Sequence, residues 1–225
     1  NLLAGDMAAK RALALAPKLA DGHLAMAGVE RFLYRDFAKA RAQNQQAADL
    51  RPNDPDAYNS LSINDAHLGK LAASVAEMRR TIALDPADSF PEFDLGLFLT
   101  IGGHYAEARE ALRRALALNP QDATAYVLLS QVEVLQNGDV NAAIKMLDNM
   151  AVGTPLNASV AARRIDLSLY RRDFDAARKL AAEYAGTFKS GPAAVTLAMA
   201  RADVEWLAGD KDAARALYRT AVELI

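Results

Sequence analysis

The sequence has no cysteine, no excess of charge of either sign and no long apolar run. Without cysteine, disulfides, thiolate metal sites and thiol nucleophiles are excluded. Lys+Arg 26 against Asp+Glu 28 gives a formal net charge of -2, and no basic stripe is visible, which argues against DNA or RNA as a partner. No uncharged apolar run approaches the roughly 18–20 residues that a membrane-spanning helix needs, so no membrane span is expected.

Motifs for catalysis and for metal binding are also missing. His23, His67 and His104 are 44 and 37 residues apart, whereas a metal site needs several convergent ligands. We expect His23 and His104 to be solvated, and His67 to point away from Asp65 on the same helix. The Gly-Gly pair at 102–103 lacks the Lys-Ser/Thr of a P-loop, and no GxSxG or HExxH motif occurs. The sequence therefore predicts neither enzyme activity nor a cofactor.

What the chain does have is apolar material for a core and a regular spacing of prolines. It is 52% hydrophobic and 24% charged, as ordered proteins are. Pro52, Pro86 and Pro120 are 34 residues apart, and the series extends to Pro17, Pro155 and Pro192 at spacings of 35, 35 and 37. The first four prolines end similar phrases, such as TIALDP and ALALNP. Because proline cannot continue a helix, we expect a helix to end at each one.

A second signal falls near the middle of each unit and predicts two helices per unit. The stretches YRDFAKA, LGKLAAS, GGHYAEA, NGDVNAA, RRDFDAA and AGDKDAA each combine Gly or a polar pair with a small residue further on. This is typical of a tight turn followed by a helix start. Asp54 before Pro55 predicts an N-cap, and Ser89 with Glu92 has the spacing of a capping box. Strands are not expected, since no run alternates apolar and polar residues.

Unit length, turn and terminal proline resemble the tetratricopeptide repeat. Small residues occupy the positions where that family needs them, because helices packed about 8–10 Å apart leave no room for long side chains at the crossing. On the first helices these are Gly28, Ser62, Gly96 and Ser130; on the second helices they are Ala40, Ser74, Ala108 and Ala143, then Ala47, Thr81 and Ala115. Tyr58 and Tyr126 match the family's bulky anchor, which Leu24 and Glu92 replace elsewhere. The second small position of the fourth unit holds Met150 instead of a small residue. In the fifth and sixth units the small position of the first helix holds Ile165 and Ala202, each next to an arginine. We therefore expect the first helices of these two units to be shifted in phase or packed differently.

The resemblance implies an all-α fold, a right-handed α-solenoid of antiparallel helix pairs, as one domain over 1–225. A leading helix over 1–17 would precede repeats at about 18–52, 53–86, 87–120, 121–155, 156–192 and 193–225. Residues 8–58 also resemble the helical-repeat tails of bacterial nucleotide cyclases and winged-helix signalling regulators. The chain begins at Asn1 without Met, so we expect it to be a piece of a longer bacterial protein. The cytoplasm is favoured, with the periplasm open if a membrane helix precedes the piece.

Stacked helix pairs build an inner wall from their first helices, where a partner protein or peptide would bind. The repeat frame predicts the wall residues Val29, Phe32, Leu33, Asn59, Ile63, Ala66, His67, Phe93, Leu97, Thr100, Ile101, Val127, Gln131, Val134 and Leu135, with Asp203 and Trp206 in the doubtful sixth unit. This apolar wall suits an amphipathic helix or extended apolar peptide, and the alternative is a structural or self-associating module. Arg163-Arg164 and Arg171-Arg172 are read as a solvated face or as a docking point for an acidic segment. Trp206 is either a ligand contact or a cap on the last core layer.

Overall fold

The protein is all-helical. The computed structural model describes residues 2–224, and within them thirteen α-helices and no strand are found. The chain divides into two compact units, Asn1–Leu118 and Asn119–Ile225. The helices are α1 Leu2–Leu15, α2 Ala20–Phe32, α3 Phe37–Leu50, α4 Pro55–His67, α5 Leu71–Leu84, α6 Ser89–Ile101, α7 Tyr105–Leu118, α8 Ala123–Asn137, α9 Val140–Asp148, α10 Ala158–Tyr170, α11 Phe174–Thr187, α12 Gly191–Ala208 and α13 Lys211–Glu223.

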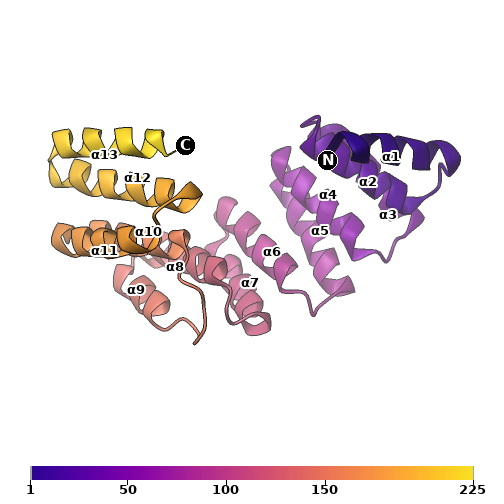
Figure 1. Ribbon diagram of the computed structural model, residues 1–225. Coiled ribbons are helices and arrows are strands. Elements are labelled where there is room, and N and C mark those ends of the chain that lie inside the picture. Colours follow the sequence, from indigo (N-terminus) through magenta and orange to yellow (C-terminus); the bar gives the residue numbers. More distant parts are fainter. Residues whose placement is uncertain (1, 225) are drawn as a thin grey trace. The chain divides into compact units, whose positions relative to one another are not determined.

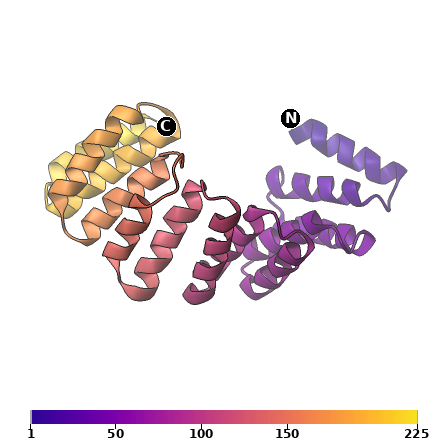
Figure 2. The same cartoon turned by 90° about the horizontal axis from the view of Figure 1, so that it is seen from below.

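Successive helices pack as pairs, which confirms the predicted solenoid of helix hairpins (Figure 1). In the first unit α2 pairs with α3, α4 with α5 and α6 with α7, and α1 packs on α2. In the second unit the pairs are α8 with α9, α10 with α11 and α12 with α13, and they are seen from below in Figure 2. The single-domain organisation and the repeat boundaries stay predictions.

Prolines mark the ends of the early helices but not of the later ones. Helices α1, α3, α5 and α7 each end two residues before Pro17, Pro52, Pro86 and Pro120 respectively, as predicted. The prediction is wrong for the last two prolines. Helix α9 stops at Asp148, well before Pro155, and Pro192 lies in the first turn of α12. A proline in the first turn is tolerated because the N–H it lacks would have no helical partner there.

Aspartate side chains cap most of the helix starts. Asp54 accepts a hydrogen bond from the Asp56 N–H and Pro55 opens α4, as predicted. The predicted capping box at Ser89 is wrong, because the N-cap of α6 is Asp88. Its side chain accepts a hydrogen bond from the Phe90 N–H. Glu92 instead turns inward to Arg114, whose Nε donates to Glu92 Oε1 at 2.7 Å. Glu92 is only 5% exposed, and this charged hydrogen bond compensates one of its carboxylate oxygens for lost hydration, whereas Oε2 is buried without a hydrogen-bond partner among the described residues.

The turn inside each pair needs one residue with left-handed backbone conformation. These residues recur at the period of the repeat: Arg35, Gly69, Gly103, Gly138, Arg172 and Gly209, with φ between 57° and 99°. Glycine adopts this conformation without a Cβ clash, whereas arginine is strained in it. The "Gly or a polar pair" of the sequence pattern is therefore one structural position, occupied by glycine in four pairs and by arginine in two.

The small residues at the helix crossings are buried, with the exception of Gly28. Ala40, Ser74, Ala108 and Ala143 on the second helices are 0% exposed, as are Ser62 and Ser130 on the first helices. A Cβ on Gly96 would lie 2.6 Å from Leu112 Cγ, so the predicted close approach holds there. The prediction of close helix approach is wrong at Gly28, where an added Cβ would meet no atom within 4 Å. Ile165 is also fully buried, so α10 carries a large side chain at its crossing, as the predicted different packing requires.

The two basic pairs of the fifth repeat do not form one solvated face. Arg163 is 7% exposed, and its Nε and Nη2 donate to Ser130 Oγ and O at 2.9 and 3.0 Å. Arg164 Nη2 donates to the Leu147 carbonyl at 2.9 Å. The reading of these two residues as solvated or as a docking point is therefore wrong. They tie α10 to α8 and α9, because a buried guanidinium needs its donors satisfied.

Candidate partner-binding surfaces

In the first unit, α4 and α6 enclose an apolar hollow of about 360 Å³, named here the α4–α6 hollow. Its lining consists of Ile63, Ala66, His67, Asp94, Leu97, Phe98 and Ile101. Five of these residues are wall positions counted from the sequence. They meet because residues three and four apart share one face of a helix, and the same positions recur 34 residues later on the next first helix.

Asp94 is the one carboxylate of the α4–α6 hollow. Burial raises its pKa to about 6, and the negative charge of Asp88 adds to the effect. Burial penalises the ionised form since a low-dielectric surrounding solvates charge poorly. A cation or a hydrogen-bond donor entering the hollow would therefore meet a carboxylate with little competing solvation.

His67 and Asp65 point to different neighbours, as predicted from their spacing. The His67 ring stacks on Phe37 with centroids 4.2 Å apart and an interplanar angle of 16°. Asp65 is 0% exposed and accepts from Arg41 Nε at 2.6 Å. His67 is therefore a partly stacked wall residue, while Asp65 belongs to the packing of α4 on α3.

Several predicted wall residues lie elsewhere. Val29 is buried with Ala9 and Met26, because α1 packs on this face of α2. Thr100 is 9% exposed, and its hydroxyl donates to the Gly96 carbonyl in the turn before it. These two side chains present little surface to a partner. Phe32 is 54% exposed, whereas Leu33, Asn59 and Phe93 are half-buried and line none of the hollows described here.

In the second unit, two hollows share the surface of α10. The α8–α10 hollow, about 270 Å³, is lined by Val127, Gln131, Val134, Leu135, Ser159, Ala162, Arg163, Asp166 and Tyr170. The α10–α12 hollow, about 310 Å³, is lined by Asp166, Leu169, Tyr170, Asp203, Trp206 and Leu207. All four wall residues predicted on α8 and both predicted on α12 are among them. Asp166 and Tyr170 line both hollows and so join them.

The residues on α10 were missed because the frame of the fifth repeat was in doubt. The signal was present: adding the 35-residue step from Pro120 to Pro155 to Val127, Gln131 and Leu135 gives Ala162, Asp166 and Tyr170. Asp94 had no such signal, since it lies one residue after the counted position Phe93.

Groups that support catalysis are sparse in the described part of the chain. Residues 2–224 contain no cluster of three or more His, Cys, Asp or Glu side chains arranged to hold a metal ion. His104 is exposed, with its side chain 63% accessible. His23 is not simply solvated as predicted, because its ring nitrogens lie 2.7 Å from Gln43 Oε1 and 2.9 Å from the Pro17 carbonyl. Among the helices of residues 2–224, none has the length and apolar character to cross a membrane.

Comparison with known proteins identifies the repeat. A tetratricopeptide repeat family model matches residues 102–158 and 163–224, more than half of the chain. No curated protein matches the chain. A tetratricopeptide repeat protein from Parabacteroides merdae has a similar solved structure, with a TM-score of 0.79 and 14% identity over 99% of this chain and 86% of that one.

Two further solved structures are also similar. PilF from Pseudomonas aeruginosa has a TM-score of 0.67 and 19% identity over 88% of each chain. PilW, described as a type IV pilus biogenesis factor, has a TM-score of 0.70 and 21% identity over 84% of this chain and 87% of that chain. At these identities the likeness concerns the fold. The family match together with the observed helix pairs leads to one conclusion: this chain belongs to the tetratricopeptide repeat family.

Proposed function

We propose that the first helices of the pairs bind a peptide or helix of a partner protein on their apolar face. The tetratricopeptide fold itself indicates a protein–protein interaction scaffold, in a family that is generally non-catalytic. The finer proposal concerns where the partner lies: in the α4–α6 hollow of the first unit, and in the α8–α10 and α10–α12 hollows of the second. Phe32, Leu33, Asn59 and Phe93 are proposed as flanking contacts.

The proposal rests on one agreement: residues that the repeat spacing predicts on the inner wall are also residues that line the hollows. Ile63, His67, Leu97 and Ile101 were counted from the repeat frame, and they line one hollow. Val127, Gln131 and Val134 likewise line another. Ile101 is 61% exposed and Leu135 is 47% exposed, so apolar area remains open to a partner. Grooves of this kind suit an amphipathic helix or an extended apolar segment.

The test is selection of peptides from a random library displayed on phage, using the immobilised protein as bait. Affinities of the selected peptides are then measured by fluorescence polarisation for wild type and variants. Ile101→Asp, Leu135→Asp and Leu207→Asp place a charge in the α4–α6, α8–α10 and α10–α12 hollows respectively, and at least one of them should weaken each peptide by ten-fold or more. Phe90→Asp and Val152→Asp are the matched controls, because these side chains are 70% and 98% exposed and line none of the described hollows.

Circular dichroism must show unchanged helicity for all five variants. Peptides that bind wild type and all five variants equally would place the binding surface outside the three hollows. Failure to select any peptide above a bare-support control would overturn the proposal itself.

Self-association is the second candidate, and exposed apolar residues on α1 favour it. Met7 and Leu15 are 68% and 76% exposed on a helix whose other face packs on α2. A second copy covering them would remove this apolar area from water. Light scattering over a range of protein concentrations separates the two candidates. A mass that stays monomeric rejects self-association, whereas a concentration-dependent mass that Met7→Lys abolishes supports it.

The place of the chain in a larger protein is also part of the proposal. The resemblance of residues 8–58 to helical-repeat tails of bacterial signalling proteins supports a regulatory role in such a protein. The sequence of the full gene tests this directly: a cyclase or winged-helix domain next to the repeats is the expected result, and its absence from a complete gene would reject the role.

A further inference from the structure

The α10–α12 hollow differs from an ordinary apolar groove in its combination of side chains. Tyr170, Trp206 and Leu207 are 59%, 45% and 56% exposed around it, while Leu169, 9% exposed, forms part of its lining. Large exposed side chains gathered at one hollow are uncommon on a surface without a partner. Trp206 is thus a wall residue whose ring is partly exposed. The core of this unit is formed by other residues, such as Leu197 and Val204.

Two carboxylates lie in the same hollow. Asp166 comes from α10 and Asp203 from α12, and both are half-buried. Asp203 Oδ1 accepts a hydrogen bond from the Tyr218 hydroxyl at 2.5 Å. The pKa of Asp166 is raised, first by burial and further by the charge of Asp203, although Arg163 opposes the shift. The two acidic groups are therefore close enough to repel each other in a poorly solvated place.

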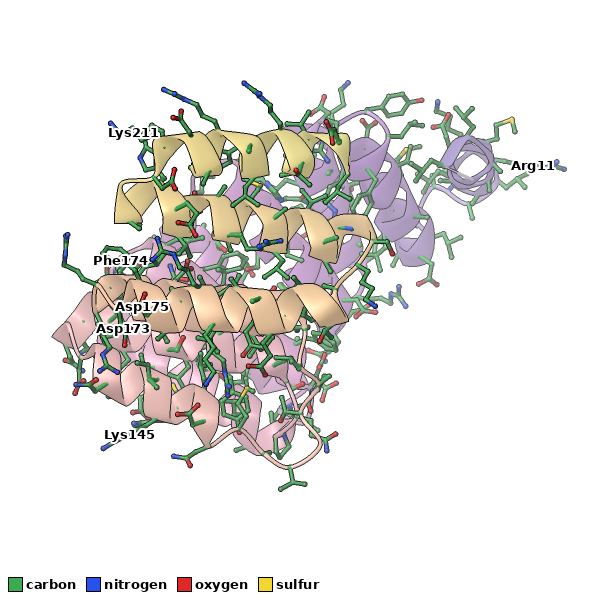
Figure 3. All side chains as sticks on the ribbon, turned by 60° about the vertical axis from the view of Figure 1, so that its left-hand side comes forward. Arg11, Lys145, Asp173, Phe174, Asp175 and Lys211 are labelled. Carbon is green, nitrogen blue, oxygen red and sulfur yellow. The ribbon has the colours of Figure 1, made fainter. Side chains whose placement is uncertain are left out.

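The basic side chains near the hollow already contact other residues of the chain. Arg163 is 7% exposed, donates to Ser130 with both Nε and Nη2, and has its guanidinium carbon 5.7 Å from the centre of the Tyr170 ring. Lys211, at the start of α13 (Figure 3), has its Nζ 5.4 Å from the centre of the Trp206 ring. Neither residue is among those that line the α10–α12 hollow, whose charged lining consists of the two aspartates. The hollow thus presents negative charge beside two aromatic rings.

We propose that the α10–α12 hollow binds a lysine or arginine side chain of the partner peptide, with its charge against Asp166 and Asp203 and its stem against Tyr170 and Trp206. This inference rests on the proposed function and names the chemistry of the partner. An ion pair with two carboxylates and contact with aromatic faces both favour a cation over a neutral side chain. Leu207 and the adjoining α8–α10 hollow would hold apolar residues on either side of the basic one.

The single tryptophan makes the site observable. Because the chain has one Trp, its fluorescence reports on this hollow alone. Peptides selected from the phage library are synthesised with each basic residue intact and with arginine replaced by citrulline, or lysine by norleucine. Each is titrated into the full chain while Trp206 fluorescence is followed. We expect selected peptides to be enriched in Lys or Arg flanked by apolar residues, and the neutral analogues to bind at least ten-fold more weakly.

Protein variants test the same contact from the other side. Asp166→Asn and Asp203→Asn should each weaken the basic peptides at least five-fold and leave the neutral analogues unchanged. Asp175→Asn is the matched control, because Asp175 lies at the start of α11 with its side chain 99% accessible (Figure 3). Asp166→Asn is the cleaner variant, since it does not disturb the Tyr218 hydrogen bond; unfolding curves check that both variants are folded.

The outcomes separate the two proposals. Peptides that bind with unchanged Trp206 fluorescence, or equally well with neutral analogues, overturn the basic-residue inference while the proposed function stands. No selected peptide at all overturns both. Peptides lacking any excess of Lys and Arg also contradict the inference.

Discussion

Substitution of Gly96 by alanine should destabilise the first unit, whereas the same change at Gly28 should stabilise it. Both glycines occupy the small position of a first helix, two repeats apart. An added Cβ on Gly96 would lie 2.6 and 2.8 Å from Leu112 Cγ and Cδ2 and 3.4 Å from the Ala108 carbonyl oxygen. On Gly28 it would meet no atom within 4 Å.

The magnitudes follow from two opposing effects. Alanine in place of glycine inside a helix gains about 0.5–1 kcal/mol. At Gly96 the gain is outweighed, because Leu112 is 0% exposed and would have to shift within the core to relieve the 2.6 Å contact, and overpacking of this kind costs about 1–3 kcal/mol. We expect Gly96→Ala to lower the free energy of unfolding by about 1–2 kcal/mol and Gly28→Ala to raise it by about 0.5 kcal/mol.

Thermal and urea unfolding followed by circular dichroism measures both changes. About 1 kcal/mol corresponds to a shift of about 2–4 °C in Tm for a chain of this size. Leu112→Ala supplies the decisive background: with the leucine side chain gone, Gly96→Ala should become neutral or stabilising. If Gly96→Ala stabilises wild type as much as Gly28→Ala does, close helix approach is not the reason for the small residue at this position.

Three further predictions concern charge and turn geometry. Asp94→Asn should stabilise the protein at pH 7.5 by about 1–3 kcal/mol, because a carboxyl pKa raised from 3.8 to about 6 makes ionisation costly in the folded state. The gain should be constant above about pH 6.5 and shrink as pH falls toward 4, which urea unfolding at several pH values measures; a pH-independent gain contradicts the assignment. Arg35→Gly and Arg172→Gly should each raise the free energy of unfolding by about 0.5–1 kcal/mol, and Tm with it, because both residues have φ of 57° and glycine relieves the strain. A lower Tm would mean that the arginine side-chain contacts dominate. Arg114→Ala should destabilise by about 1–3 kcal/mol by leaving the Glu92 carboxylate, 5% exposed, without its partner, and an unchanged denaturation midpoint would show that water replaces it.

One pair of repeats shows how the same position can be filled by different chemistry. Tyr58 is buried under the guanidinium of Arg80, whose central carbon is 3.9 Å from the ring centre. One repeat later, Glu92 and Arg114 occupy the equivalent positions and form an ion pair. The arginine is kept and its partner changes from an aromatic face to a carboxylate. The sequence comparison registered Glu92 as a departure from the family, and the structure shows the compensating contact.

The sequence alone determined most of what depends on local spacing, although it misplaced the N-cap of α6 and the helix boundaries near Pro155 and Pro192. Helix starts at Asp54, tight turns at the left-handed positions, and the shared face of Ile63, His67 and Ala66 all follow from residues within one turn or one helix of each other. Repetition extended this local information, since a position 34 or 35 residues later meets the same surroundings. For this reason most residues counted on α4, α6 and α8 line the hollows of these helices, with Asn59, Phe93 and Thr100 as the exceptions.

Tertiary structure decided what lies against each face. Val29 has the spacing of a wall residue but is buried, because α1 covers it. Gly28 has the spacing of a crossing residue but has open space above it. Asp166 and Asp203 are 37 residues apart in sequence, and their electrostatic coupling exists only because α10 and α12 pack side by side. Periodicity fixes the face of its own helix on which a side chain lies. The burial of that side chain, its contacts and the charges around it depend on which other helix packs against that face.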